Sequence, residues 1–389
     1  MPSVASFADL FRVRPPRTSA RWALLAGLTT VLAVGLPARG EAQSAVLGSV
    51  RPVPRVPGGH AFAPLAPLEI AGRPFYPYAF DGHVHTEESP DADHPPHEVL
   101  EGAARVGLDA LVFTDHGSPH AKLVSGRLAG VHAFAGQEIG GPFGHAVFWN
   151  VSDKQLVAPS RTSLAERAAF AHAHGGLVVL CHPGWWIEGR AEDPIGWMTP
   201  EALAKGGLSG DIDALELWNG VYDAPLRKLI GLWESALEAG VFVPIVGNSD
   251  FHRFRAHRLG GPRNVAHCER PEPERCLWDA VKAGRLFVTD GPSLLFSADD
   301  KAMGETLESK PGASLRVHVS TASPRGGELR VLLGRTRVRT VPLPVNAQVD
   351  EQFELAAPGS SSYLRVEIVR GEPEVVELLS NVIRVKVVP

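Results

Sequence analysis

Two histidines spaced two residues apart, His83 and His85, stand in the segment YAFDGHVHTEESPDAD, which also carries Asp91. In an extended strand, residues i and i+2 point to the same face, so both imidazoles would face one ion while Val84 packs the other way. Imidazole nitrogens are common ligands of zinc and related metals. The segment therefore predicts a metal site.

Four further apolar runs carry residues of the same kind. They are Asp115 and His116 after LDALVF, Glu138 and His145 in AFAGQEIGGPFGHAVFW, His182 after GLVVLC, and Asp250 and His252 after VFVPIV. Each run has the composition of a buried parallel strand with polar residues at its C-terminal tip, where barrel enzymes place their active sites. A single histidine in this position is more often structural than a ligand. The recurrence of the pattern favours one shared metal centre.

The order of the motifs is HxH, SxD, TDH, a lone Glu with a downstream His, His-Pro and finally SDxH. This order resembles the polymerase and histidinol phosphatase (PHP) superfamily of metallohydrolases, over roughly residues 79 to 290. The segments DALELWNG and GRLFVTDGPSL, with a β-rich tail ending LLSNVIRV, are most similar to the carbaryl-hydrolase branch, often labelled CehA/McbA. The resemblance implies a metal-dependent hydrolase.

The resemblance also implies a ligand set. One ion would be held by His83, His85, Glu138 and Asp250, a second by Glu138, His145 and His182, and a third by Asp91, His116 and His252. Glu138 is the only acidic residue of its block, so its carboxylate is expected to bridge ions as an imidazole could not. Asp93 lies two residues from Asp91 and could replace it. The expected cofactors are two to three divalent ions, with zinc, manganese and iron all suited to these ligands.

Ions that lie about 3.5 to 4 Å apart clamp an oxyanion and lower the pKa of a bridging water toward neutrality. The expected nucleophile is therefore a metal-bridging hydroxide, with Glu138, Asp250 and His182 as the residues that carry catalysis. No recognisable nucleophile-elbow motif is present in the sequence. The predicted reaction is phosphoester hydrolysis. Hydrolysis of a carbamate, ester or amide is the alternative, and a non-catalytic metal-binding module is a third possibility that the complete ligand set disfavours.

Several other polar residues near the motifs could support the centre. Asp81, Asp115, Glu216 and Asn219 are candidates to orient the imidazoles, or else they cap strand ends. Arg253 and Arg263 could contact a substrate anion, or else they are solvated surface residues. Trp185, Trp186 and Trp197 follow the His-Pro motif, in a loop that would line the mouth of the site. Trp185 is accordingly predicted to contact an apolar part of the substrate, the alternative being that these rings pack the loop onto the barrel.

The fold follows from periodicity. Apolar strands alternate with helical stretches at residues 96–107, 163–176, 225–240 and 274–284, each ending at or near a glycine. This alternation predicts a parallel α/β barrel over residues 79–290, and the resemblance implies a distorted barrel of seven strands. After residue 290 the pattern changes to short alternating strands separated by Pro, Gly and Ser, which predicts a β-sandwich of about 90 residues over 291–389. Six strands are predicted there, at residues 314–323, 327–336, 337–345, 348–357, 362–371 and 381–388.

The N-terminus predicts export. An arginine-rich start precedes the apolar run WALLAGLTTVLAVGL and the small-residue segment PARGEAQS, which predicts a signal peptide over residues 1–42. A membrane anchor is the alternative, but a run of 15 residues is short for spanning a bilayer. A Pro-rich linker would follow over residues 43–78. The mature protein is expected in the periplasm or outside the cell, without a stable membrane anchor.

Charge and cysteine content agree with this interpretation. Without the five arginines and two acidic residues of 1–42, the chain has 33 basic and 41 acidic residues, so nucleic acid is not an expected partner and a small-molecule substrate is. Cys268 and Cys276 are eight residues apart and form either a disulfide loop or two free thiols. Cys181 would face away from His182 on a strand, so it is predicted to be a buried apolar residue and not a ligand.

Overall fold

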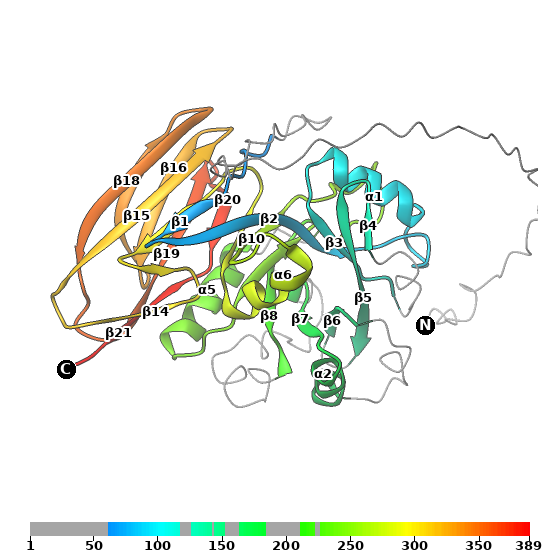
Figure 1. Ribbon diagram of the computed structural model, residues 1–389, viewed down its shortest axis with the longest axis horizontal. Coiled ribbons are helices and arrows are strands. Elements are labelled where there is room, and N and C mark those ends of the chain that lie inside the picture. Colours follow the sequence, from blue (N-terminus) through cyan, green and yellow to red (C-terminus); the bar gives the residue numbers. More distant parts are fainter. Residues whose placement is uncertain (1–60, 117–125, 142–143, 152–162, 184–210, 222–225) are drawn as a thin grey trace, which may run out of the picture. The chain divides into compact units, whose positions relative to one another are not determined.

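The computed structural model describes residues 61–116, 126–141, 144–151, 163–183, 211–221 and 226–389 (Figure 1). The predicted signal peptide, residues 43–60 of the predicted linker and the three tryptophans Trp185, Trp186 and Trp197 lie outside these residues. Among the residues described, none of the helices has the length and apolar character needed to cross a membrane.

The first part of the described chain is a mixed α/β region, residues 68–289. Its strands are β1 (Leu68–Ile70), β2 (Arg73–Val84), β3 (Ala110–Phe113), β4 (Gly126–Leu128), β5 (Val131–Gly141), β6 (Gly144–Trp149), β7 (Leu177–Leu180), β8 (Ala214–Asn219), β9 (Ile245–Asn248), β10 (Arg263–Cys268) and β11 (Leu286–Thr289). Its described helices are α1 (Pro96–Arg105), α2 (Leu164–Ala173), α5 (Leu226–Glu238) and α6 (Pro273–Ala283), which occupy the four predicted helical stretches.

Local signals explain where these helices begin and end. Helix α2 starts with a capping box, in which the Ser163 hydroxyl accepts from the backbone N–H of Glu166 and the Glu166 carboxylate accepts from the backbone N–H of Ser163. Helix α6 has a proline in its first turn and ends at Gly284, whose φ of 74° is a conformation that glycine adopts without strain. These helix ends are therefore specified by residues that are neighbours in the sequence.

Among the described strands of the α/β region, four pairings are parallel and six are antiparallel. β2, β3 and β5 pair in parallel, as do β7, β8 and β9. β6 is antiparallel to both β5 and β7, and β10 is antiparallel to β2. The prediction that each ligand-bearing apolar run forms a parallel strand is therefore wrong for β6, the strand that carries His145. Only two residues separate β5 from β6, too few for the crossover that parallel pairing requires.

The chain after β9 returns to the end of β2. The backbone N–H of His85 donates to the carbonyl of Phe251 at 2.8 Å, and the N–H of Phe251 donates to the carbonyl of His83 at 3.3 Å. Val84 and Phe251 also form an isolated parallel bridge. The first and last metal-ligand motifs of the sequence therefore lie side by side.

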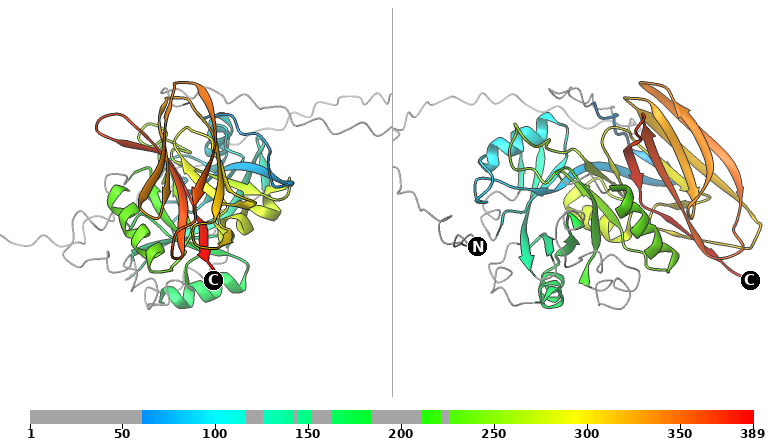
Figure 2. Two further views of the ribbon diagram at one scale, coloured as in Figure 1. Left: turned by 90° about the vertical axis from the view of Figure 1, so that its left-hand side faces the viewer. Right: turned by 180° about the vertical axis from the view of Figure 1, so that it is seen from behind.

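The C-terminal β region contains two sheets that share an apolar core (Figure 2). Its strands are β12 (Leu295–Ala298), β13 (Lys301–Ala302), β14 (Thr306–Ser309), β15 (Ser314–Ser323), β16 (Gly327–Leu333), β17 (Thr336–Leu343), β18 (Ala347–Ala356), β19 (Ser362–Arg370), β20 (Val375–Ser380) and β21 (Ile383–Val387). Phe296 and Val319 of one sheet belong to the same buried cluster as Val331 and Ile368 of the other. All six predicted strands are present, whereas β12, β13, β14 and β20 were not predicted.

The two regions share hydrogen bonds across residue 290. Strand β20 pairs antiparallel with β11, which continues the sheet of the α/β region into the C-terminal region. The Asn381 side chain accepts from the backbone N–H of Ile245 at 2.8 Å and donates to the carbonyls of Ile245 and Leu286 at 2.9 and 3.1 Å. All the described residues belong to one compact unit, Leu47–Pro389, so the predicted domain boundary falls inside a continuous sheet.

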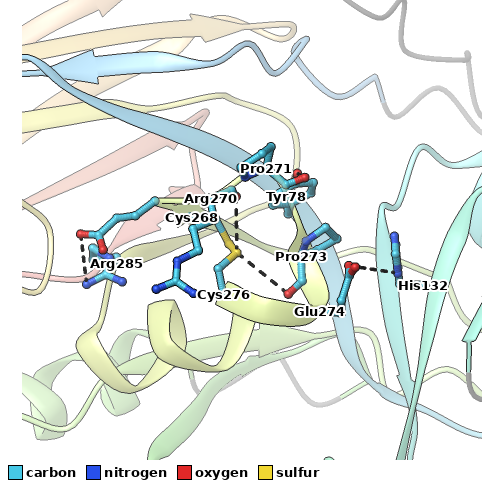
Figure 3. Close-up of a disulfide and its surroundings, with 10 residues drawn as sticks. Tyr78, His132, Cys268, Arg270, Pro271, Pro273, Glu274, Cys276 and Arg285 are labelled. Carbon is cyan, nitrogen blue, oxygen red and sulfur yellow. Dashed lines mark hydrogen bonds and ion pairs between the residues drawn. A yellow bond between two sulfur atoms is a disulfide. The ribbon is translucent and has the colours of Figure 1, made fainter.

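A disulfide links Cys268, the last residue of β10, to Cys276 in α6 (Figure 3). Nearby, the Tyr78 hydroxyl of β2 donates to the carbonyl of Pro271 at 2.6 Å. Of the two possibilities that the sequence left open for this cysteine pair, the structure has the disulfide. It fixes the start of α6 against the end of β10, a strand that pairs with both β2 and β11.

Candidate metal centre

The carboxylate of Glu138 lies at the centre of the predicted ligand cluster. Its Oε1 is 2.7 Å from His145 Nδ1 and 2.9 Å from His182 Nε2. Its Oε2 is 3.2 Å from the Nε2 atoms of both His83 and His85. Glu138 is on β5 and only 2% exposed, so these imidazoles surround a carboxylate that solvent hardly reaches. A single side chain thus contacts ligand candidates from three separate sequence motifs.

The HxH pair shares a second carboxylate. Asp250 Oδ1 lies 3.3 Å from His83 Nε2 and 3.5 Å from His85 Nε2. Both Nε2 atoms are buried and have no hydrogen-bond partner of normal geometry. These separations exceed those of charge-assisted hydrogen bonds, about 2.7 to 2.9 Å. They match the spacing of about 3.0 to 3.5 Å between neighbouring donors that bind one ion through bonds of about 2.0 to 2.2 Å. The donor set therefore fits a metal ion.

The third predicted group lies nearer to solvent. Asp91 Oδ2 is 3.5 Å from His116 Nε2 and 3.4 Å from His252 Nε2, and His85 belongs to the same group. His116 also places its Nδ1 3.4 Å from Glu138 Oε2. The sequence left Asp91 and Asp93 as alternatives. Asp93 instead accepts from Arg253 Nε at 2.8 Å, so the structure brings Asp91 to the cluster.

Three groups of potential ligands result, each with ligand atoms within 4.8 Å of one another. They are His83, Glu138, Cys181 and His182; His85, Asp91, His116 and His252; and His83, His85 and Asp250. Eight of the nine predicted ligands are in these groups. The ninth, His145, is outside them but contacts Glu138. It is the second residue of β6 and pairs with Gly140, where an added Cβ would lie 3.1 Å from the imidazole.

Cys181 corrects a sequence prediction. Its Sγ lies 3.6 Å from Glu138 Oε1, so its side chain faces the same cluster as that of His182. The prediction relied on strand alternation, but β7 ends at Leu180 and His182 has a φ of 29°. Alternation of side chains does not hold across such a turn. Asp250, whose carboxylate is another predicted ligand, also has a left-handed backbone conformation, with a φ of 52°.

Glu216, on β8, orients the deepest imidazole. Its Oε1 accepts from His83 Nδ1 at 3.1 Å and from Asn248 Nδ2 at 2.8 Å. Its Oε2 accepts from the backbone N–H of His182 at 2.8 Å and from Asn219 Nδ2 at 3.1 Å. Because Nδ1 of His83 carries the donated proton, its Nε2 presents a lone pair to the cluster. Glu216 and Asn219 therefore do more than cap a strand end.

His85 is oriented through a relay. Its Nδ1 donates to Ser89 Oγ at 3.0 Å, and Ser89 Oγ donates to Asp115 Oδ1 at 2.9 Å. Asp115 also accepts from the backbone N–H and the hydroxyl of Thr86, at 2.6 and 2.9 Å. Asp115 thus acts on His85 through Ser89 and holds the loop that follows the HxH motif.

Of the two roles that the sequence left open for Asp81, its contacts match the capping of a strand end. It accepts from the backbone N–H groups of His83, Ser249 and Gly260, and from the Ser249 hydroxyl at 2.5 Å. These donors are backbone N–H groups and a hydroxyl, so Asp81 ties the end of β2 to the segment after β9 and does not orient a ring directly. Complete burial raises its pKa to about 6, although the hydrogen bonds from Ser249, Gly260 and His83 act in the opposite direction.

The electrostatics of the cluster favour positive charge. Burial alone would raise the pKa of Glu138 and Asp250, yet the charge of His83 and the hydrogen bonds from neighbouring imidazoles hold both pKa values below their ordinary range. Burial likewise lowers the pKa of His85, but the neighbouring carboxylates of Asp250 and Glu138 outweigh it and raise that pKa to about 9. A site that attracts protons this strongly attracts divalent cations for the same reason.

The two arginines that were candidates to contact substrate have different surroundings in the structure. Arg253 is half exposed and its guanidinium pairs with Asp93. Arg263 is buried, donates to the carbonyl of Gly260 at 2.8 Å and stacks over the ring of Phe62. The prediction that Arg263 meets a substrate anion is therefore wrong, because its guanidinium is used inside the fold. Trp185 lies outside the described residues.

Sequence reasoning missed two polar residues of the centre. Asn248 stands directly before the SDxH motif and accepts from the backbone N–H of Gly82 at 2.8 Å. Ser89 is the serine of the SxD motif and contacts His85. Ser89 lies within a recognised motif and Asn248 directly precedes one, so their position beside the predicted ligands was the available signal.

No protein-family model and no curated protein matches the chain. Among solved structures, a two-domain protein from Bacteroides vulgatus that contains a predicted PHP-like metal-dependent phosphoesterase is 16% identical, with a TM-score of 0.48, over 80% of this chain and 95% of that one. A candidate metal-dependent phosphoesterase from Bifidobacterium adolescentis is 15% identical, with a TM-score of 0.33, over 46% and 90% of the two chains. The sulfur carrier protein SoxY from Chlorobium limicola is 18% identical, with a TM-score of 0.20, over 25% and 79%. At these values the likenesses assign neither a fold nor a reaction to this chain.

Proposed function

We propose that this chain is a metal-dependent hydrolase of the PHP type that holds two to three divalent ions and cleaves phosphoesters. The observation that carries the proposal is the position of Glu138, whose two oxygens contact imidazoles from different motifs in a buried cluster. A carboxylate shared in this way suits a bridge between ions.

The ligand assignment follows the three groups. His83, His85, Asp250 and Glu138 would hold one ion; Glu138, His145 and His182 a second; and Asp91, His116 and His252 a third. When bound, such ions polarise a phosphoryl or carbonyl oxygen and lower the pKa of water toward neutrality. The chain's own contribution is to fix the donors. Glu216 and Ser89 hold the Nδ1 protons of His83 and His85, so that the two Nε2 atoms stay directed at the cluster.

Charge balance supports an anionic substrate. The nine ligands include three carboxylates, and Glu216 adds a fourth negative charge directly behind them. Three divalent ions would bring six positive charges and leave an excess of positive charge at the site, whereas the mature chain as a whole is negative. A phosphate group would therefore be attracted locally, while a neutral carbamate gains little from this excess.

The same proposal includes the finer fold. Seven strands, β2, β3, β5, β6, β7, β8 and β9, follow one another by pairing, and hydrogen bonds between His85 and Phe251 bring the last back to the first. This supports a distorted seven-stranded barrel with the ligands at one end. His145 reaches that end from the start of antiparallel β6.

The test is hydrolysis by the mature protein loaded separately with Zn²⁺, Mn²⁺ or Fe²⁺. The substrates are p-nitrophenyl phosphate, bis-p-nitrophenyl phosphate and a naphthyl carbamate. The proposal expects metal-dependent release of nitrophenol from at least one phosphate ester, abolished by Glu138→Gln. Cleavage of the carbamate alone would replace the phosphoesterase by a carbamate hydrolase. Metal binding without any turnover would reduce the chain to a binding module.

We also propose export to the periplasm or the exterior, with a small molecule as substrate. The disulfide between Cys268 and Cys276 supports an oxidising compartment. Mass spectrometry of periplasmic or secreted protein is expected to find an N-terminus near Gln43. Full-length protein in the cytosol would contradict this.

A further inference from the structure

Cys181 has a position that the proposed hydrolase mechanism leaves unused. It is the only free cysteine of the chain, directly follows β7 and is 1% exposed. It belongs to one group of potential ligand atoms with His83, Glu138 and His182. The other two groups contain only nitrogen and oxygen donors.

The geometry fits a sulfur donor. Cys181 Sγ lies 3.6 Å from Glu138 Oε1. A sulfur and an oxygen that bind the same tetrahedral ion, at about 2.3 Å and 2.0 to 2.2 Å, are separated by about 3.6 Å. A second, independent observation is the Nε2 of His83, in a fully buried side chain, which has no hydrogen-bond partner of normal geometry. Nitrogen, oxygen and sulfur donors therefore converge in this group.

We propose that Cys181 supplies a thiolate ligand to the ion held by Glu138 and His182, with His83 beside it. This inference rests on the proposed metal centre and adds to it a sulfur position. On binding, the Sγ–H proton passes to solvent, and the sulfur lone pair forms the bond to the ion without any change of oxidation state. One ion of the centre then has a soft donor, whereas the others have only imidazole and carboxylate.

A consequence is selectivity between positions. Soft thiolate donors favour ions such as Zn²⁺ and Cd²⁺ over Mn²⁺, which prefers carboxylate and water. The position next to Cys181 is thus the one that retains a thiophilic ion when Mn²⁺ is in excess. The alternative is that the Cys181 thiol only donates a hydrogen bond to Glu138 Oε1 and never binds an ion.

The first test uses mature, metal-depleted protein titrated with Co²⁺ under anaerobic, non-reducing conditions. The proposal expects a sulfur-to-cobalt charge-transfer band in the near ultraviolet, lost in Cys181→Ser, while visible ligand-field bands remain in both proteins. Cys268 and Cys276 cannot produce the band because they are bonded to each other. Ligand-field bands without the charge-transfer band in the wild type would overturn the sulfur ligand and leave the metal centre intact. Absence of both kinds of band would overturn the metal centre itself.

The second test compares affinities and guards against a folding defect. Removing a residue that only hydrogen-bonds a metal ligand typically weakens metal binding about tenfold to hundredfold. Because Cys181 would bind the ion itself, Cys181→Ser and Cys181→Ala are both expected to weaken Cd²⁺ binding by at least that factor. Mn²⁺ affinity is expected to change much less. An equal loss for both ions would show that Cys181 acts through packing or through its hydrogen bond to Glu138, and would overturn the proposal.

Discussion

Glu216 Oε1 lies 3.1 Å from Nδ1 of His83, and both side chains are fully buried. The carboxylate can only accept hydrogen bonds, so it fixes the proton of His83 on Nδ1 and leaves Nε2 to bind an ion. Glu216→Gln replaces an acceptor oxygen by a donor amide without changing the volume. Metal affinity is expected to fall about tenfold to hundredfold, as measured by competition with a chelator.

The matched control for this change is Glu238→Gln. Glu238 lies on α5, is exposed and pairs with Arg335 Nε at 2.8 Å. The same change of charge at that position is expected to leave metal affinity unaltered. Equal losses in the two variants would mean that net charge, and not the proton position on His83, governs binding.

A second prediction concerns the number of ions. Because both oxygens of Glu138 face imidazoles, Glu138→Gln is expected to remove more than one of the two to three equivalents that the wild type binds. Elemental analysis of purified, dialysed protein measures this directly. Glu274→Gln is the control, since Glu274 pairs with His132 at 3.7 Å outside the cluster. A wild type that binds one equivalent, with no change in Glu138→Gln, would exclude a shared carboxylate.

A third prediction separates chemistry from folding. His182→Ala removes an imidazole 2.9 Å from Glu138 Oε1 but keeps the backbone N–H that donates to Glu216. Hydrolysis is expected to fall by orders of magnitude while the thermal unfolding of the apoprotein changes little. His172→Ala is the control, because His172 makes a 2.9 Å contact with Asp213, a similar imidazole–carboxylate pair away from the cluster. Similar losses of turnover in both variants would place His182 outside the chemistry.

The fourth prediction tests the connection between the two regions. Asn381→Ala leaves the buried N–H and carbonyl of Ile245 without their side-chain partner. At about 1 to 3 kcal/mol for each of the two unsatisfied groups, the free energy of unfolding is expected to fall by about 2 to 6 kcal/mol. Gln348→Ala, at an exposed amide, is expected to stay within about 0.5 kcal/mol. Urea denaturation measures both. A neutral Asn381→Ala would mean that the regions are stabilised independently.

The fifth prediction is a pH dependence. Burial, with a smaller effect of Arg285, lowers the pKa of His267 to about 4 from an ordinary value of 6.5. Below pH 6.5 the unfolded chain binds a proton that the folded chain refuses until about pH 4, so this residue makes stability fall as the pH falls through that window. His267→Gln is expected to remove up to about 3 kcal/mol of this loss.

The measurement for His267 is urea denaturation at several pH values between 4 and 7. Wild type and variant are compared at each pH, so that contributions from the histidines of the cluster cancel. His97→Gln, at an exposed histidine of α1, accounts for the general effect of replacing a histidine. A wild type and a His267→Gln variant with the same slope would contradict the lowered pKa.

The parts of the fold that local patterns specify were predictable. Periodicity located all four described helices, and alternation located strand β15 over Ser314–Ser323. Ligand types at strand ends were enough to gather His83, Glu138 and Asp250 into one centre. These features depend on neighbours in the sequence, and the rules of strand and helix geometry apply to them directly.

Long-range geometry was not predictable in the same way. The antiparallel direction of β6 follows from the two-residue connection to β5. That connection could not be recognised from the sequence, because the end of β5 at Gly141 was not known. The turn that brings Cys181 into the cluster depends on the φ of His182, which no spacing reveals. The hydrogen bonds of Asn381 to Ile245 join residues 136 positions apart.

His182 and Asp250, whose side chains are proposed metal ligands, both have a left-handed backbone conformation. Only glycine adopts this conformation freely, and for other residues it costs about 1 to 2 kcal/mol each. The buried strands β7 and β9 immediately before them supply the stability that maintains these turns. Stability and chemistry are therefore opposed at both positions. In a lineage that no longer needed the metal centre, drift toward glycine at residues 182 and 250 would strengthen the fold while erasing its ligands.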